Sequence, residues 1–80
     1  MSKRLERMRR NPAADWTIGD IEAVCRESRI ECVRSRKGSS HYKIKHPAVP
    51  EILTVPFARP IKSRYIRLLI AFIDAVRAPP

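Results

Sequence analysis

The chain has 80 residues, of which 17 are Lys or Arg and 8 are Asp or Glu, so its formal net charge is +9. A chain this short forms one domain with a thin core, and its hydrophobic content of 44% is ordinary for a folded protein. The excess of positive charge predicts a polyanionic partner, such as RNA, DNA, an anionic membrane or an acidic protein. A basic surface that serves only solubility is the alternative interpretation.

No apolar run approaches the roughly 20 residues that a membrane-spanning helix requires, and the longest run, Leu68 to Phe72, lies inside an amphipathic pattern. The basic N-terminus is not followed by an apolar segment, so it does not resemble a secretory signal, and we expect a cytoplasmic protein. Cys25 and Cys32 are too few for a disulfide framework. Both have apolar neighbours, and we expect buried free thiols.

The first predicted element is a short basic helix over residues 2–10, in which Leu5 and Met8 share one face. Asn11-Pro12 ends it, because the residue before a proline avoids the helical region. We therefore assign residues 1–16 to a basic N-terminal extension and residues 17–78 to the folded domain. The extension either binds nucleic acid or is a solvated basic face, since its apolar face is too small for membrane anchoring.

The second predicted helix begins at Thr17, a favourable N-cap, with Asp20 placed close to a capping box, and fades around Ser28. From residue 31 the spacing of apolar residues changes from the helical period to alternation. This alternation predicts strands over residues 31–36, 41–45 and 52–55. A turn at residues 37–40 and a proline-containing connection at 46–51 join them. A final helix, which Ser63 can cap, runs to about Val76. Its broad apolar face is more typical of core than of a partner groove: Tyr65, Ile66, Leu68, Leu69, Ile70, Phe72, Ile73 and Val76.

This order predicts an α+β fold, α-β-β-β-α, in which two helices cover one face of a three-stranded antiparallel sheet. The short basic N-terminal helix precedes this fold in the sequence. The other face of the sheet is left to solvent or a ligand. In the central strand, His41, Lys43 and Lys45 point to that open face. The expected core combines both helices with the buried sheet face: Ile21, Leu69, Tyr42, Cys32 or Val33, and Leu53 or Val55.

His41 begins the strand after the turn at Gly38, and two lysines follow on its face. An imidazole with an ordinary pKa of about 6.5 can transfer protons near neutral pH, and ammonium groups bind phosphate and stabilise charge that develops in a transition state. This arrangement suits phosphodiester chemistry. A surface histidine without a function is the alternative. His46, before Pro47, is more typical of a turn or packing residue.

Metal and cofactor motifs are absent from the sequence. The spacing of Cys25, Cys32, His41 and His46 lacks the close cysteine pairs of zinc fingers. No carboxylate pair lies in a plausible magnesium site, and there is no glycine-rich phosphate loop. We therefore expect no metal and no small-molecule cofactor.

Three motifs occur in a fixed order: Gly38-Ser39-Ser40-His41 with the apolar Ile44, then His46-Pro47, then Leu53-Thr54-Val55-Pro56. Together they resemble the HicA-type toxins, over roughly residues 17–76. The resemblance implies a fold like that of double-stranded-RNA-binding domains, metal-independent cleavage of mRNA, and inhibition by a HicB-type antitoxin. The family's catalytic histidine matches His41, and the glycine of its turn matches Gly38.

The expected RNA-binding residues lie on or around the hairpin that carries His41: Arg36, Lys37, Gly38, Ser39, Ser40, Lys43, Lys45 and Arg59. Three functions fit this surface. The first is an endoribonuclease toxin, the second a non-catalytic RNA-binding module of the same fold, and the third an interaction protein whose basic face binds an acidic partner.

Overall fold

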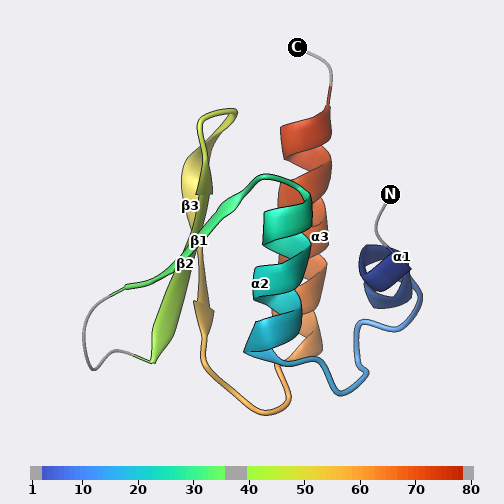
Figure 1. Cartoon of the computed structure of the whole chain (residues 1–80). Helices are drawn as coiled ribbons and strands as arrows, with labels where there is room; N and C mark the ends of the chain where they lie inside the picture. The colour runs from blue at the N-terminus through green and yellow to red at the C-terminus, as the bar shows by residue number, and fades with distance from the viewer. Residues whose placement is uncertain (1–2, 36–39, 79–80) are drawn as a thin grey trace.

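The computed structural model describes residues 3–35 and 40–78, and Figure 1 shows their arrangement. The element order is α1 (Lys3–Arg10), α2 (Ile18–Glu27), β1 (Glu31–Arg34), β2 (His41–His46), β3 (Val49–Pro56) and α3 (Ser63–Arg77). The strands form one antiparallel sheet in the order β1-β2-β3, and α2 and α3 lie on the same side of it. The predicted α+β architecture is therefore confirmed. None of the helices in the described ranges is long and apolar enough to cross a membrane.

The start of α2 is stabilised as the sequence predicts. The Thr17 hydroxyl accepts a hydrogen bond from the Asp20 N–H at 3.3 Å, and the Asp20 carboxylate accepts one from the Thr17 N–H at 2.9 Å. This reciprocal capping box satisfies two backbone donors at the helix end. The prediction that Ser63 caps α3 is wrong, because Lys62 takes the extended N-cap conformation and Ser63 is the first helical residue.

Strand β3 is longer than predicted, because it begins at Val49 and includes Pro50 and Pro56. His46 pairs with Val49, so only a two-residue turn separates β2 from β3. In the sequence, the prolines predicted that the strand would not extend over these positions. An edge strand tolerates proline, because a proline that faces the free edge does not have to donate a hydrogen bond to a neighbouring strand. Strand β1 ends at Arg34. The predicted strand end at residue 36 and most of the predicted turn lie outside the described residues.

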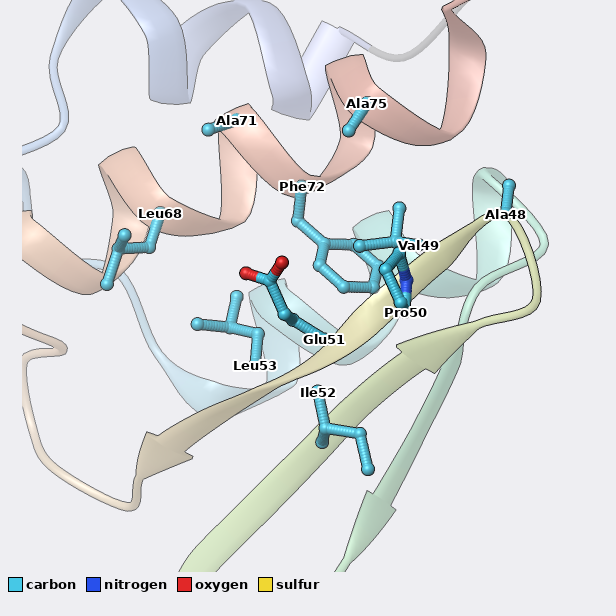
Figure 2. Close-up of a pocket in the computed structure, with 10 residues that line it drawn as sticks. All are labelled: Ala48, Val49, Pro50, Glu51, Ile52, Leu53, Leu68, Ala71, Phe72 and Ala75. Atoms are coloured by element: carbon cyan, nitrogen blue, oxygen red, sulfur yellow. The ribbon is translucent and has the colours of Figure 1, made fainter. Parts of the chain in front are cut away.

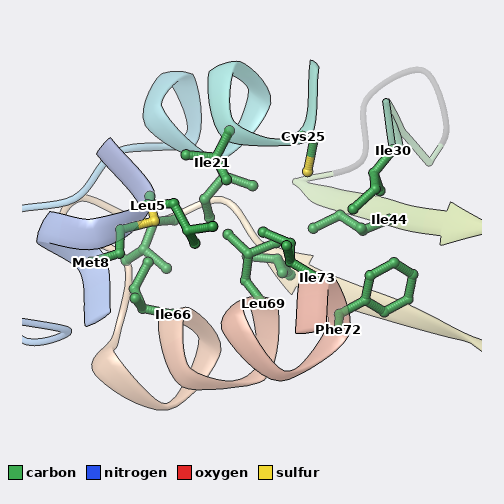
Figure 3. Packing of buried hydrophobic residues seen from close by; sticks show 13 residues of the cluster. Leu5, Met8, Ile21, Cys25, Ile30, Ile44, Ile66, Leu69, Phe72 and Ile73 are labelled. Carbon is green, nitrogen blue, oxygen red and sulfur yellow. The ribbon is translucent and has the colours of Figure 1, made fainter. Parts of the chain in front are cut away.

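The core lies between the helices and one face of the sheet (Figure 3). Ile21, Leu69 and Val55 are fully buried, and Leu53 and Cys32 pack against them, as expected. Two expectations are wrong. Tyr42 is only half-buried and lies outside the cluster, because Ile44, farther from the turn, fills that position from β2. Leu68 is 49% exposed, so the buried face of α3 is narrower than its sequence indicates. The buried set is Leu5, Met8, Ile21, Val24, Cys25, Ile30, Ile44, Val55, Ile61, Ile66, Leu69, Phe72 and Ile73.

The basic N-terminal helix packs against the rest of the fold. Leu5 and Met8 of α1 are buried, and the helix lies against α2 and α3 on the side away from the sheet (Figure 1). The Arg4 guanidinium pairs with the Asp20 carboxylate at 3.3 Å, which ties α1 to α2. The positive charges of α1 are therefore carried on a different side of the molecule from the open sheet face.

Candidate nucleic-acid interface

The face of the sheet opposite α2 and α3 is not covered by any element in the described part of the chain (Figure 1). Side chains alternate along β2, so His41, Lys43 and Lys45 are exposed on this face while Ile44 is buried on the other. The predicted orientation of β2 is therefore confirmed. We call this uncovered surface, centred on β2, the open face.

The strand register determines which residues of β1 and β3 lie beside each β2 side chain. Lys43 lies between Val33 of β1 and Thr54 of β3, and His41 pairs with Pro56. Residues two apart on a strand are separated by about 7 Å. The histidine and the two lysines therefore form an evenly spaced row along the centre of the sheet.

The two lysines differ in their electrostatic surroundings. The Lys45 ammonium lies 3.4 Å from the carboxylate of Glu31, its cross-strand partner. Lys43 forms no ion pair with any described residue. Glu31 offsets part of the positive charge at one end of the row, so Lys43 is the more available cation for an anionic ligand.

The backbone around His41 is held from both sides. The His41 carbonyl accepts hydrogen bonds from the Ser35 N–H at 3.0 Å and from the Ser35 hydroxyl at 3.2 Å. On the β3 side, the Ser40 carbonyl accepts a hydrogen bond from the Phe57 N–H. These bonds position the backbone that carries the imidazole, while the His41 residue itself stays exposed.

The remaining predicted binding residues are only partly assembled. Ser40 is exposed and directly precedes His41. Arg59 is exposed in the loop after β3, three residues beyond Pro56, which pairs with His41. The other four predicted residues lie outside the described residues: Arg36, Lys37, Gly38 and Ser39.

Sequence reasoning missed several contributors to the open face. Glu31, Val33 and Thr54 lie beside the lysines because of strand register, which depends on a turn that the pattern does not specify. Phe57 is 49% exposed, but strand alternation puts it on the same side of β3 as the buried Val55, so it is not assigned to the open face.

His46 lies at the far end of β2 and has a structural role. Its Nδ1 accepts a hydrogen bond from the Ala48 N–H at 3.0 Å, within the turn between β2 and β3. This is consistent with the interpretation of His46 as a turn residue.

The two thiols are free and lie close together. Cys25 is buried in α2, whereas Cys32 of β1 is only half-buried, so the expectation that both are buried is wrong for Cys32. A hydrogen bond between them raises the pKa of Cys25 and lowers the pKa of Cys32. Across residues 3–35 and 40–78, no three His, Cys, Asp or Glu side chains lie close enough together to hold a metal ion.

The open face thus combines a proton-transfer group with cations, which suits the binding and cleavage of a phosphodiester. No family model, curated protein or solved structure matches the chain.

Proposed function

We propose that the open face binds RNA and that the protein is a cytoplasmic endoribonuclease of the HicA type, which cleaves mRNA without a metal. The observation that carries this proposal is the placement of His41 and Lys43 two residues apart on the uncovered face of the central strand. The net charge of +9 favours a polyanionic substrate.

RNA suits this surface better than a protein partner does, because the cations lie in a regular row. Lys43 and Lys45 are separated by about 7 Å along the strand, so the two ammonium groups can contact different phosphates of one RNA strand.

The chemistry uses the 2′-hydroxyl that RNA carries beside each phosphate. His41 removes the proton from this hydroxyl, and the oxygen attacks the adjacent phosphorus. The new O2′–P bond forms as the P–O5′ bond breaks, and the leaving 5′-oxygen takes a proton from water. Lys43 stabilises the negative charge that develops on the phosphate oxygens. The products are a 2′,3′-cyclic phosphate and a 5′-hydroxyl.

A non-catalytic RNA-binding module is the second candidate, because the same cations would hold RNA without cleaving it. The two candidates differ at His41. Binding alone tolerates loss of the imidazole, whereas acid–base catalysis does not.

The test compares wild type, His41→Ala and His46→Ala with an end-labelled RNA, with and without EDTA. We expect His41→Ala to lose about 10²–10⁴-fold in cleavage rate while its RNA affinity and circular dichroism stay unchanged. His46→Ala is the matched histidine control and should cleave like wild type. Equal cleavage by wild type and His41→Ala would remove His41 from the mechanism, and a folded wild type that binds RNA without cleaving it would favour the binding module.

The proposal includes a HicB-type antitoxin that covers the open face with carboxylates of its own. Opposite charges at such an interface mainly raise the association rate. The Lys43→Glu variant should therefore bind the antitoxin more slowly at low salt, with a smaller change in the dissociation rate. An antitoxin complex in which His41 still reacts with diethyl pyrocarbonate as in the free protein would contradict this arrangement.

A further inference from the structure

A groove runs between β3 and α3 on the helix side of the sheet (Figure 2). It encloses about 450 Å³ and is mostly apolar. Leu68 is 49% exposed at this groove, and Ala71 and Ala75 continue the same stripe of α3 with exposed, small side chains. Small residues leave room for another backbone to approach, so the groove can receive a chain segment as well as single side chains.

The groove lies beside an unpaired strand edge. In the sheet order β1-β2-β3, strand β3 has only one neighbour. The hydrogen bond from the Phe57 N–H to the Ser40 carbonyl shows which alternate residues of β3 are hydrogen-bonded to β2. Because bonded residues alternate in an antiparallel pair, Val55 directs its backbone groups to β2 and Thr54 directs its N–H and C=O to the free edge.

Two prolines limit the part of this edge that can pair. Pro50 and Pro56 lack an N–H, and the register of β2 and β3 shifts between Ile44 and His46, so the donors that β3 can offer to a new strand lie between the prolines, at Thr54 and in the irregular stretch before Leu53. An added segment therefore pairs with β3 over only about five residues. Such a short contact needs side-chain interactions as well, and the neighbouring groove supplies them.

Glu51 is the charged residue of the groove. Its carboxylate points towards α3, between Leu68 and Phe72, whereas Ile52 points to the other side of β3 (Figure 2). Among the described residues Glu51 forms no ion pair, although the protein carries a net charge of +9. A ligand with a Lys or Arg at this point would complement the carboxylate, and a nucleic acid would not.

We propose that this groove binds an extended segment of a partner protein, which adds a fourth strand to β3, places apolar side chains against α3 and pairs one Lys or Arg with Glu51. Main-chain hydrogen bonds along the free edge contribute affinity, and the groove selects alternate side chains. A second copy of this chain is a poorer occupant, because two molecules of charge +9 repel each other. The site is separate from the open face and does not depend on the ribonuclease proposal.

The experiment uses the whole protein and synthetic seven-residue peptides in which valine alternates with threonine. In one panel lysine replaces each valine in turn, and in a second panel glutamate does so. We expect lysine peptides to bind and to shift the backbone amide NMR signals of Thr54, Ala71 and Ala75. Methylation of alternate peptide amides should abolish binding, because strand addition needs those donors.

Charge reversal identifies the ion pair. Glu51→Lys should weaken the lysine peptides about five-fold or more and strengthen the glutamate peptides. Glu31→Lys makes the same change of net charge on the opposite edge strand and should leave peptide binding unchanged. The proposal is overturned if no peptide binds, if the shifts map to the open face, or if Glu51→Lys and Glu31→Lys act alike. Self-association that Leu68→Glu abolishes would assign the groove to a second copy instead.

Discussion

Arg9 of α1 and Asp74 of α3 are 65 residues apart in the sequence, yet the Arg9 guanidinium donates two hydrogen bonds to the Asp74 carboxylate, one of them at 3.0 Å. Beneath this exposed pair, Leu5 and Met8 are buried. The N-terminal helix is therefore held by both charged and apolar contacts, which contribute unequally to stability.

We expect Met8→Ala to lower the free energy of unfolding by about 2–5 kcal/mol, because it leaves a cavity at a fully buried position. Arg9→Ala should lower it by less than about 1 kcal/mol, since both partners of the ion pair are largely exposed. Urea denaturation measures both, with Arg10→Ala as the matched surface control. If Met8→Ala costs no more than Arg10→Ala, α1 does not pack on the core in solution.

Acid should weaken the Arg9–Asp74 pair. The hydrogen bond from Arg9 lowers the pKa of Asp74 below its ordinary value. A carboxyl whose pKa is lower in the folded state stabilises the fold above its unfolded pKa of about 3.9 and loses that contribution as pH falls through the folded pKa. The stability difference between wild type and Asp74→Asn should therefore be constant near pH 7 and shrink below about pH 4. A stability difference between the two proteins that grows as the pH falls would contradict this prediction.

Thr17→Ala removes the side-chain half of the capping box and should lower the free energy of unfolding by about 1 kcal/mol. Thr17→Ser keeps the hydroxyl and should recover most of the loss. Ser63→Ala provides the control at α3, where the N-cap residue makes no side-chain cap, and should change stability by a few tenths of a kcal/mol at most. Equal losses at the two helices would contradict this assignment.

The two lysines of the open face should contribute unequally to RNA binding. Lys43→Gln should reduce the slope of log affinity against log salt by about 0.7–0.9, the value for one phosphate contact. Lys45→Gln should have a smaller effect, because Glu31 already offsets that charge, and Glu31→Gln should strengthen binding. Fluorescence anisotropy at several salt concentrations tests this, with Lys3→Gln on α1 as the control. A larger effect from Lys3 would place the RNA elsewhere.

Cys32 should react with a maleimide much faster than Cys25. Cys25 is fully buried, and its thiol hydrogen bond lowers the pKa of Cys32. The Cys32→Ala variant should therefore resist labelling until it is denatured. Cys25→Ala should keep one reactive thiol but shift its pH profile upwards, and an unshifted profile would show that the thiols do not interact in solution.

The sequence predicted local structure well where one pattern dominates. Thr17 and Asp20 specify the start of α2, because a capping box involves only neighbouring residues. The alternation from His41 to Lys45 placed the lysines on one face and Ile44 on the other, because the strand period of two leaves no other arrangement. Candidate site residues on β2 were predictable for the same reason.

Tertiary structure decided the features that depend on residues distant in the sequence. Glu31 reaches Lys45 only through the register of two strands, and Pro50 belongs to β3 only because that strand lies at the edge of the sheet. Leu68 fits the helical apolar pattern, yet it stays exposed because the sheet ends at β3. Periodicity determines which side of an element is apolar, whereas the neighbours that cover that side are determined only by how the elements pack together.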